Sequence, residues 1–410
     1  MATTSSDSLN QVFQQARRAA LQLAIADVSL KRSALGAMAT ALSEAKDDIL
    51  EANTLDLETS REMAVSELIL DWLKLTPERL QGAIDILFRL AAMGHIVSGM
   101  PTAGQLQIQR RIPLGVVALI YEAFPELGAI AAGLSLCSSN GLILRGGSEA
   151  SQTNQMLVKI LRQAIAAVHL PEDALVLLSP GLGETLREVV SATEIDLVIP
   201  YGRPSLIRQV VQQATVPVLR TVTGNCYLYW GDSGSVDTVL TMIVESHQGD
   251  PDAVNAIEKV LIPEDHSTSA LTRLWNRLWE KGFELRGDPD LVQDFPDLAP
   301  VDADDWSQPY LTRRVAFQRT ASLSSAIALI NRYSSGHADC LATESYLESQ
   351  QFTQAIRSRS VYINQSPRFA RNPDSAADIA LGVAIPGLQA GGRIGLESLT
   401  RSQRVWIGTL

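Results

Sequence analysis

Short apolar runs alternate with amphipathic stretches along most of this chain. Residues 116–120 (VVALI) and 142–144 (LIL) are wholly apolar and partly β-branched, which is typical of strands buried on both faces of a sheet. Between them, Pro125 suits the first turn of a helix, where its missing N–H costs nothing. This strand–helix–strand order predicts a βαβ unit whose second strand ends in a glycine loop at residues 145–149.

The same alternation continues on both sides of this unit. Apolar residues at helical spacing predict two amphipathic helices within residues 12–49, interrupted near residues 26–29. Thr76 followed by Pro77 predicts the start of another helix, and the acidic stretch 288–306 is expected to be a solvated surface loop. Further strands are expected at residues 174–178, 195–200, 259–262 and 360–364. The whole pattern indicates an α/β fold with an open, mostly parallel sheet.

The glycine loop combines an arginine with bare backbone, in the order Arg145-Gly146-Gly147-Ser148-Glu149. Backbone N–H groups and a guanidinium suit the phosphate of a nucleotide, so the loop is a candidate anion site. An ordinary strand-to-helix connection with a surface arginine explains the same residues, and both interpretations stay open. A second glycine turn, which contains Gly181 and Gly183, is only a weak cofactor signal.

Composition excludes several classes of protein. With 410 residues, of which 46% are hydrophobic, the chain can bury large cores in two or three domains. A net charge of −11 argues against nucleic acid or an anionic membrane as the main partner. Three scattered cysteines fit neither a disulfide framework nor a metal site and indicate a reducing cytoplasm. No apolar run approaches ~18 residues, so no membrane span is expected, and the polar start does not resemble a signal peptide.

Several blocks of the sequence resemble the γ-glutamyl-phosphate reductases, which are also called glutamate-5-semialdehyde dehydrogenases. These blocks are PLGVV…IYEA…P, NGLILRGGSE, LKLTPERL, GNCYLY and GHADC, and the resemblance runs from about residue 12 to residue 410. It implies an aldehyde-dehydrogenase-like α/β architecture. The parts expected from it are a Rossmann-type nucleotide domain at 8–235 with an assembly arm at about 104–112, a nucleophile-type substrate domain at 236–398 and an assembly strand at 399–410.

The resemblance also implies an activity. Family members use NADPH to reduce L-glutamyl 5-phosphate to L-glutamate 5-semialdehyde in proline biosynthesis, through a thioester on one cysteine. That cysteine lies in a segment of the form (K)TQRPxxCNAxE. In this chain Asn255 and Glu258 match the segment, but Val254 occupies the cysteine position. A valine has neither a lone pair nor an ionisable proton, so it cannot attack an acyl phosphate or an aldehyde.

Other departures affect positions that the resemblance assigns to the substrate. Phe124 stands where the YE(A/S)RP block has arginine, and Tyr201 stands where the IPRGG loop has arginine. His247 replaces a lysine, Asp250 replaces an arginine and Ala380 replaces a glutamate. A phosphate dianion needs several paired cations, each contributing about 1.5–3 kcal/mol as a charge-assisted hydrogen bond. We therefore expect the altered substrate site to bind the family substrate poorly.

Two residues offer substitute chemistry, and each has a simpler explanation. Cys226 belongs to the GNCYLY block and is the remaining thiol candidate, but the family pattern contains it beside the true nucleophile, which favours a packing role. His247 can act as a general base or can be a polar loop histidine. Asn255 and Glu258 can be present for capping and helix-start reasons alone.

Three functions remain open after these observations. The first is the family reaction, which the chemistry at residue 254 predicts to be lost. The second is a non-catalytic regulatory protein that binds NADP(H) through Arg145, Gly146, Gly147 and Ser148. The third is a scaffold subunit that pairs with an active paralogue. A homo-oligomer, most simply a dimer, is expected from the arm at 104–112, whose alternative interpretation is a simple edge hairpin.

Overall fold

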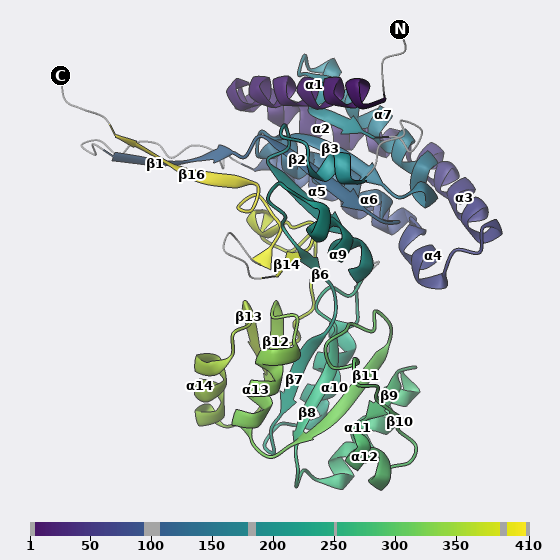
Figure 1. Ribbon diagram of the computed structural model, residues 1–410, viewed down its shortest axis with the longest axis vertical. Helices are drawn as coiled ribbons and strands as arrows, with labels where there is room; N and C mark the ends of the chain where they lie inside the picture. The colour runs from purple at the N-terminus through teal and green to yellow at the C-terminus, as the bar shows by residue number, and fades with distance from the viewer. Residues whose placement is uncertain (1–4, 94–106, 179–185, 250–251, 386–391, 407–410) are drawn as a thin grey trace. The chain divides into compact units, whose positions relative to one another are not determined.

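The computed structural model describes residues 5–93, 107–178, 186–249, 252–385 and 392–406 (Figure 1). The chain forms two compact units. The first unit comprises Met1–Thr221, Arg371–Gly382 and Arg393–Leu410, and the second comprises Val222–Ala370 and Val383–Gly392. Contacts thus divide the chain at Thr221, whereas the sequence-based division lies at residue 235, and the strand between these two points belongs to the second unit.

A four-stranded parallel sheet lies at the centre of the first unit. Its order is β4-β3-β2-β5, so the chain adds β3 and β4 on one side of β2 and then returns to place β5 on the other. The residues of β2 and β5 are buried along their whole length, as the apolar runs predict. The strands are β2 (Val116–Tyr121), β3 (Gly141–Gly146), β4 (Leu175–Leu177) and β5 (Leu197–Tyr201).

Helices of the first unit begin where the sequence places their caps. The Asp27 side chain accepts the N–H of Ser29 and starts a new helix, which explains the interruption near residues 26–29. Thr76 caps the helix that starts at Pro77, as predicted. The helices are α1 (Ser5–Ile25), α2 (Val28–Glu44), α3 (Lys46–Glu62), α4 (Glu67–Leu73), α5 (Pro77–Ala92), α6 (Pro125–Cys137), α7 (Ser151–Ala167), α8 (Leu186–Val190) and α9 (Pro204–Gln213), with short 3-10 turns at Ser148–Ala150, Glu172–Ala174 and Ala376–Asp378.

A two-stranded antiparallel ribbon extends from the first unit (Figure 1). It pairs β1 (Gln107–Pro113) with β16 (Thr400–Trp406), and most of its described side chains are exposed or half-buried. Strands therefore occur in both segments that the sequence assigns to an assembly arm. Three further strands lie close to the points where the chain passes between the units: β6 (Thr221–Val222), β14 (Val383–Ala384) and β15 (Gly392–Arg393).

The second unit contains a seven-stranded sheet whose pairings are all parallel. Its order is β10-β9-β11-β8-β7-β12-β13. The strands are β7 (Cys226–Trp230), β8 (Ile257–Pro263), β9 (Glu284–Gly287), β10 (Ala299–Pro300), β11 (Arg314–Thr320), β12 (Ala338–Ala342) and β13 (Ser360–Ile363). The helices are α10 (Val236–Ser246), α11 (Thr268–Glu280), α12 (Pro289–Asp294), α13 (Leu323–Tyr333) and α14 (Tyr346–Ala355).

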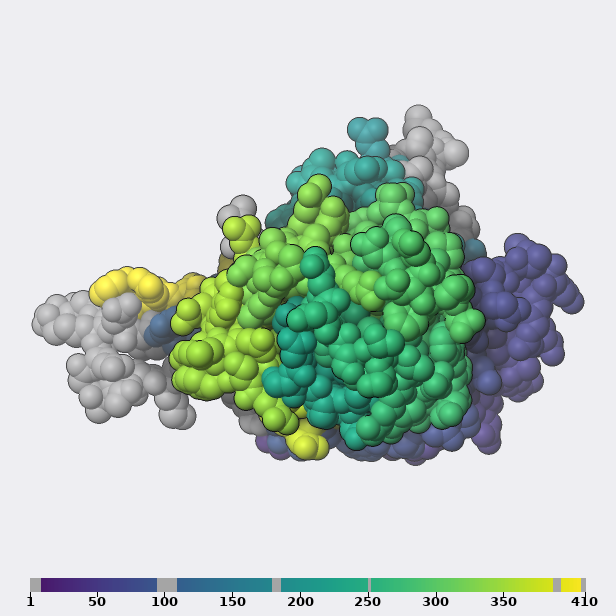
Figure 2. Space-filling view, turned by 90° about the horizontal axis from the view of Figure 1, so that it is seen from below, coloured from purple at the N-terminus to yellow at the C-terminus, as the bar shows by residue number. Residues whose placement is uncertain are grey.

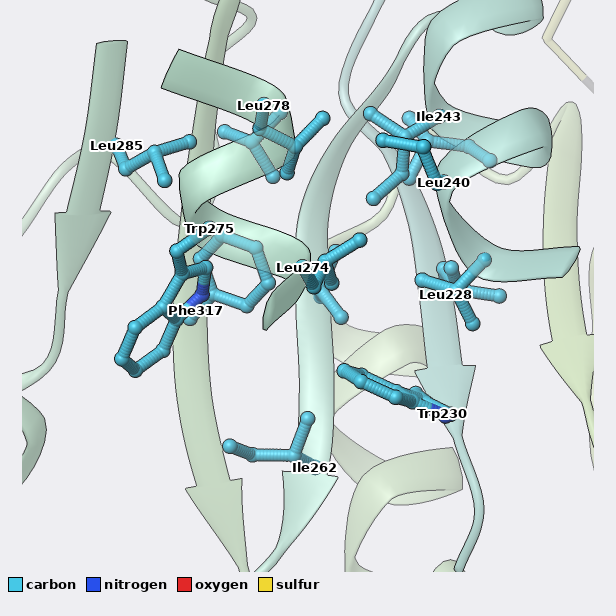
Figure 3. Close-up of a cluster of buried hydrophobic side chains, with 14 of the residues drawn as sticks. Leu228, Trp230, Leu240, Ile243, Ile262, Leu274, Trp275, Leu278, Leu285 and Phe317 are labelled. Carbon is cyan, nitrogen blue, oxygen red and sulfur yellow. The ribbon is translucent and has the colours of Figure 1, made fainter. Parts of the chain in front are cut away.

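Two apolar clusters cover the faces of this sheet. On one face, side chains of α10 and α11 pack with Trp230, Trp275 and Phe317 (Figure 3). On the other face, α13 and α14 pack against Tyr227, Tyr229 and other strand residues. Figure 2 shows the surface of the second unit, coloured from teal to yellow-green.

The acidic stretch 288–306 differs from its sequence-based expectation. The acidic stretch 288–306 is not a plain loop, because it contains α12 and β10. Asp288 accepts the N–H of Leu291 and so caps α12, which makes this acidic residue part of the helix start. Within the described ranges, no helix is long and apolar enough to cross a membrane.

Candidate functional site

Val254 lies at the amino edge of the second unit's sheet, three residues before β8 begins. Its side chain is 1% exposed, and its carbonyl accepts the N–H of Gly224 at 2.9 Å. The same carbonyl lies 3.0 Å from Nε2 of His337. Residue 254 is therefore held by its backbone while an aliphatic side chain packs into the interior. Asp250, the neighbouring departure from the family pattern, lies outside the described residues.

Glu258 and Asn255 serve as anchors for other segments. The Glu258 carboxylate, fully buried, accepts backbone N–H groups from Asn225 at 2.8 Å, Tyr310 at 2.9 Å and Leu311 at 3.0 Å. Asn255 donates from Nδ2 to the carbonyl of Pro367 at 2.7 Å. These bonds join distant parts of the chain at a strand start, so neither residue caps a helix. Both are explained by architecture without reference to catalysis.

Cys226 lies beside the same carbonyl. Its Sγ is 3.3 Å from Nε2 of His337, whose Nδ1 lies 2.9 Å from Oγ of Ser335. The thiol is fully buried, and burial raises the pKa of Cys226 well above its ordinary value. Because the thiolate is the reactive form, this geometry favours the packing interpretation of Cys226 over the role of a substitute nucleophile.

His247 directly follows helix α10 and does not supply the positive charge of the lysine that the resemblance implies there. Its Nδ1 lies 3.0 Å from the carbonyl of Ile243, and its ring meets that of Phe283 edge-on at 4.9 Å. Burial lowers the pKa of His247 to about 4, so the imidazole is neutral at pH 7. Its Nε2 is buried without a hydrogen-bond partner among the described residues. The position therefore supplies no positive charge to an acyl phosphate.

The two aromatic residues at expected arginine positions contact one another in the first unit. Phe124 stacks on Trp72 with ring centroids 4.6 Å apart and meets Tyr201 edge-on at 5.3 Å. All three side chains are at most 4% exposed. The hydroxyl of Tyr201 accepts a hydrogen bond from Arg371 at 2.7 Å. Where the resemblance implies cations, the first unit has a closed aromatic cluster made of Trp72, Phe124 and Tyr201.

Gly382 lies against Tyr201 of this aromatic cluster, and Ala380 precedes it by two residues. Ala380 is fully buried and donates its N–H to the carbonyl of Arg371 at 3.2 Å. A Cβ added to Gly382 would lie 2.5 Å from Cε2 of Tyr201, so only glycine fits there. Because position 380 is fully buried, a glutamate there would carry the free-energy cost of a buried charge, which the alanine avoids.

The glycine loop lies at the carboxyl edge of the first unit's sheet, as predicted. A hollow beside it is lined by Gly146, Gly147, Asn154, Gln155, Leu177 and Leu178. Nε of Arg145 is buried and has no hydrogen-bond partner within the described part of the chain. Ser148 opens the short 3-10 turn that leads to α7. Gly181 and Gly183 lie outside the described residues.

An ion pair that the sequence analysis missed lies at the same edge. Glu122 follows β2 and Arg203 follows β5, and their side chains are 3.0 Å apart at Oε1 and Nη2. Glu122 also accepts the backbone N–H of Arg203 at 2.9 Å. The side-chain hydrogen bond to Glu122 raises the pKa of Arg203 above its ordinary value. A sequence signal existed, since Arg203 lies two residues after the position where the family loop has its arginine.

Two parallel sheets, a glycine loop at the carboxyl edge of one and residue 254 at the amino edge of the other define an aldehyde-dehydrogenase-like protein. The profile of the Aldehyde dehydrogenase family matches residues 1–265. The chain is 46% identical over 376 residues to Gamma-glutamyl phosphate reductase 2 of Synechocystis sp., with 90% of each protein covered. It therefore belongs to the γ-glutamyl phosphate reductase family, whose reaction is glutamyl-phosphate reduction in proline biosynthesis.

Solved structures support the fold. The Gamma-glutamyl phosphate reductase of Thermotoga maritima superposes with a TM-score of 0.89 at 30% identity, covering 98% of this chain and 99% of that one. Glyceraldehyde-3-phosphate dehydrogenase of Methanocaldococcus jannaschii, which is complexed with NADP, shares the fold alone, with a TM-score of 0.70 at 15% identity and coverage of 100% and 96%. Membership of the aldehyde dehydrogenase family implies a nicotinamide cofactor.

Proposed function

We propose that this chain binds NADP(H) in its first unit but does not catalyse the reductase reaction of its family. The observation that carries the proposal is the buried Val254 in a segment whose neighbours, Asn255 and Glu258, match the family pattern. The family reaction needs a thiolate to displace phosphate and to hold the acyl group as a thioester. A valine provides no atom that can form this bond.

The electrostatics support the same proposal. Phe124 and Tyr201 are packed into the closed aromatic cluster, and His247 is neutral at pH 7. Each absent cation removes a charge-assisted hydrogen bond of about 1.5–3 kcal/mol from an acyl phosphate. Losing two or more of these lowers substrate affinity by several orders of magnitude. Restoring only the nucleophile therefore leaves the substrate without its anion partners.

The nucleotide side retains suitable chemistry. The orphan Nε of Arg145 needs an acceptor, and Gly146, Gly147, Asn154 and Gln155 line an adjacent hollow. The Asn154 amide and the Glu149 carboxylate pack directly against Gly146 and Gly147, so a bound phosphate would have to displace the Glu149 side chain. These groups fit a nicotinamide dinucleotide, and Arg145 suits its 2′-phosphate. When bound, the nicotinamide supplies hydride chemistry. The residues of this chain would hold and orient the nucleotide, as expected of a cofactor-sensing regulatory protein.

Two measurements test the proposal. Purified protein with glutamate-5-semialdehyde, phosphate and NADP⁺ is expected to form no NADPH above background. Turnover at an ordinary enzyme rate, on the order of 1 s⁻¹ or more, would contradict the loss of activity. Titration with NADPH, followed by nucleotide fluorescence, is expected to show saturable binding, and an absence of binding would contradict the nucleotide-binding half.

The ribbon of β1 and β16 favours self-association as part of this proposal. A two-stranded ribbon is only marginally stable alone, so a partner that covers it, most simply a second copy, accounts for its length. A hetero-oligomer with an active paralogue in the cytoplasm is the alternative occupant. Size-exclusion chromatography with light scattering distinguishes a dimer from a monomer, and co-purification with a cysteine-bearing copy identifies the hetero-oligomer.

A further inference from the structure

The strand order of the first unit marks one place on its sheet edge. The chain places β3 and β4 on one side of β2 and β5 on the other, so the order reverses between β2 and β5. In open α/β sheets, ligands bind outside the carboxyl ends of the strands at such a reversal. The segments that leave β2 and β5 there contain Glu122 and Arg203. These two side chains are therefore placed where a ligand of the first unit is expected.

Glu122 and Arg203 neutralise each other at this point of the sheet edge. The Glu122 carboxylate contacts the Arg203 guanidinium at 3.0 Å and 3.2 Å and accepts its backbone N–H at 2.9 Å. Gly202, with φ of +148°, is the residue that permits this approach, because a Cβ there would lie 2.7 Å from Oε2 of Glu122. A second carboxylate, Glu149, accepts the N–H of Ala123 and repels Glu122. Arg203 thus pairs with Glu122, and Glu149 lies close enough to attract the guanidinium and to repel the Glu122 carboxylate.

Helix starts at this edge differ from those of the second unit. Helices α6 and α9, which follow β2 and β5, have no side-chain cap at their N-cap residues, so their first backbone N–H groups keep their positive character. Helix α7, which follows β3, differs, because its Gln152 and Thr153 N–H groups donate to the Asp56 carboxylate. In the second unit, α10, α11, α13 and α14 are each capped by a serine side chain. Uncapped helix starts together with a guanidinium favour an anionic ligand at the first unit's edge.

We propose that Arg203 is the residue that binds a phosphate group of the dinucleotide and that Glu122 is its internal competitor. Binding then requires an exchange in which the Arg203 guanidinium leaves the Glu122 carboxylate for the phosphate. The exposures of the two side chains fit this role, because Arg203 is 46% exposed and can turn, whereas Glu122 is 16% exposed and stays in place. The inference rests on the proposed NADP(H) binding and names the phosphate-binding residue of that same site.

The test compares NADPH affinity among matched variants. Glu122→Gln keeps the shape of the side chain but removes the competing charge, and it is expected to tighten NADPH binding about tenfold, the effect of one charge-assisted hydrogen bond. Arg203→Gln is expected to weaken binding by about the same factor. The double variant is expected to match Arg203→Gln, because the carboxylate acts only through the arginine. Arg208→Gln, an exposed arginine on α9, is the control and should leave affinity unchanged.

The outcomes separate the inference from the proposed function. Unchanged or weaker NADPH binding in Glu122→Gln, in protein with an unaltered circular dichroism spectrum, would overturn the inference while leaving NADP(H) binding intact. If no variant binds NADPH, the proposed function fails, and inorganic pyrophosphate then serves as the probe. A larger pyrophosphate-induced rise of Tm in Glu122→Gln than in the unmodified protein supports the exchange. Equal rises, or none, overturn it.

Discussion

Replacing Phe124 by arginine restores the residue that the family pattern has at this position, and we expect it to destabilise the first unit. Phe124 is 1% exposed, stacks on Trp72 and meets Tyr201 edge-on. Truncating a buried phenylalanine costs about 3–5 kcal/mol, which includes aromatic contacts worth about 0.5–1.5 kcal/mol each. A guanidinium in the same place adds the cost of a buried charge. The expected loss for Phe124→Arg is therefore at least about 4 kcal/mol.

Urea unfolding followed by circular dichroism measures this loss by linear extrapolation. The matched control is Phe88→Arg, because Phe88 lies on α5 and is 45% exposed, so its replacement should change the free energy of unfolding by less than about 0.5 kcal/mol. Phe124→Leu, which keeps an apolar side chain, should fall between the two. If Phe124→Arg is no less stable than Phe88→Arg, the aromatic cluster opens to accept a cation, and the argument for a lost anion site fails.

Three further predictions concern other parts of the chain. Val254→Cys is expected to show no reductase turnover, since the anion partners are still absent; full activity in this single variant would show an intact pocket. Burial lowers the pKa of His337 to about 4, so the stability contributed by the neutral imidazole is present above pH 6.5 and is lost as pH falls through 4. The stability advantage over His337→Asn should therefore shrink by ~3 kcal/mol between pH 7 and pH 4 in urea titrations, and a constant difference would refute the shift. Arg401 and Arg404 are exposed on β16, and replacing both by glutamate should lower the molecular mass measured by light scattering if the ribbon joins two copies. An unchanged mass would show that this ribbon is not the interface.

Local signals in the sequence predict much of the fold. Thr76 and Pro77 mark a helix start because a cap and a fixed φ act within one turn. The buried strand at residues 116–120 is readable because burial on both faces demands an unbroken apolar run. The acidic stretch 288–306 was harder to interpret, because the same Asp288 that indicates a solvated loop also caps α12. The sequence alone does not show that the Asp288 carboxylate accepts the N–H of Leu291.

The candidate site is less accessible from sequence because its contacts are long-range. Phe124 and Tyr201 are each identifiable as departures from a family pattern, but their mutual contact requires β2 and β5 to be neighbours. The ion pair of Glu122 and Arg203 depends on the same neighbouring strands and has no local periodicity. Composition and spacing identify unusual residues, whereas the sheet order decides which of them meet.

Glu258 shows that a residue can match a family pattern for structural reasons alone. One carboxylate gathers the N–H groups of three separate stretches of backbone, at Asn225, Tyr310 and Leu311. Losing it would remove the acceptor of one buried and two partly buried N–H donors, at up to about 1–3 kcal/mol each, whether or not the protein ever meets a substrate. Folding alone therefore explains the acidic residue four positions after Val254. Agreement at such positions identifies kinship, and it carries no information on turnover.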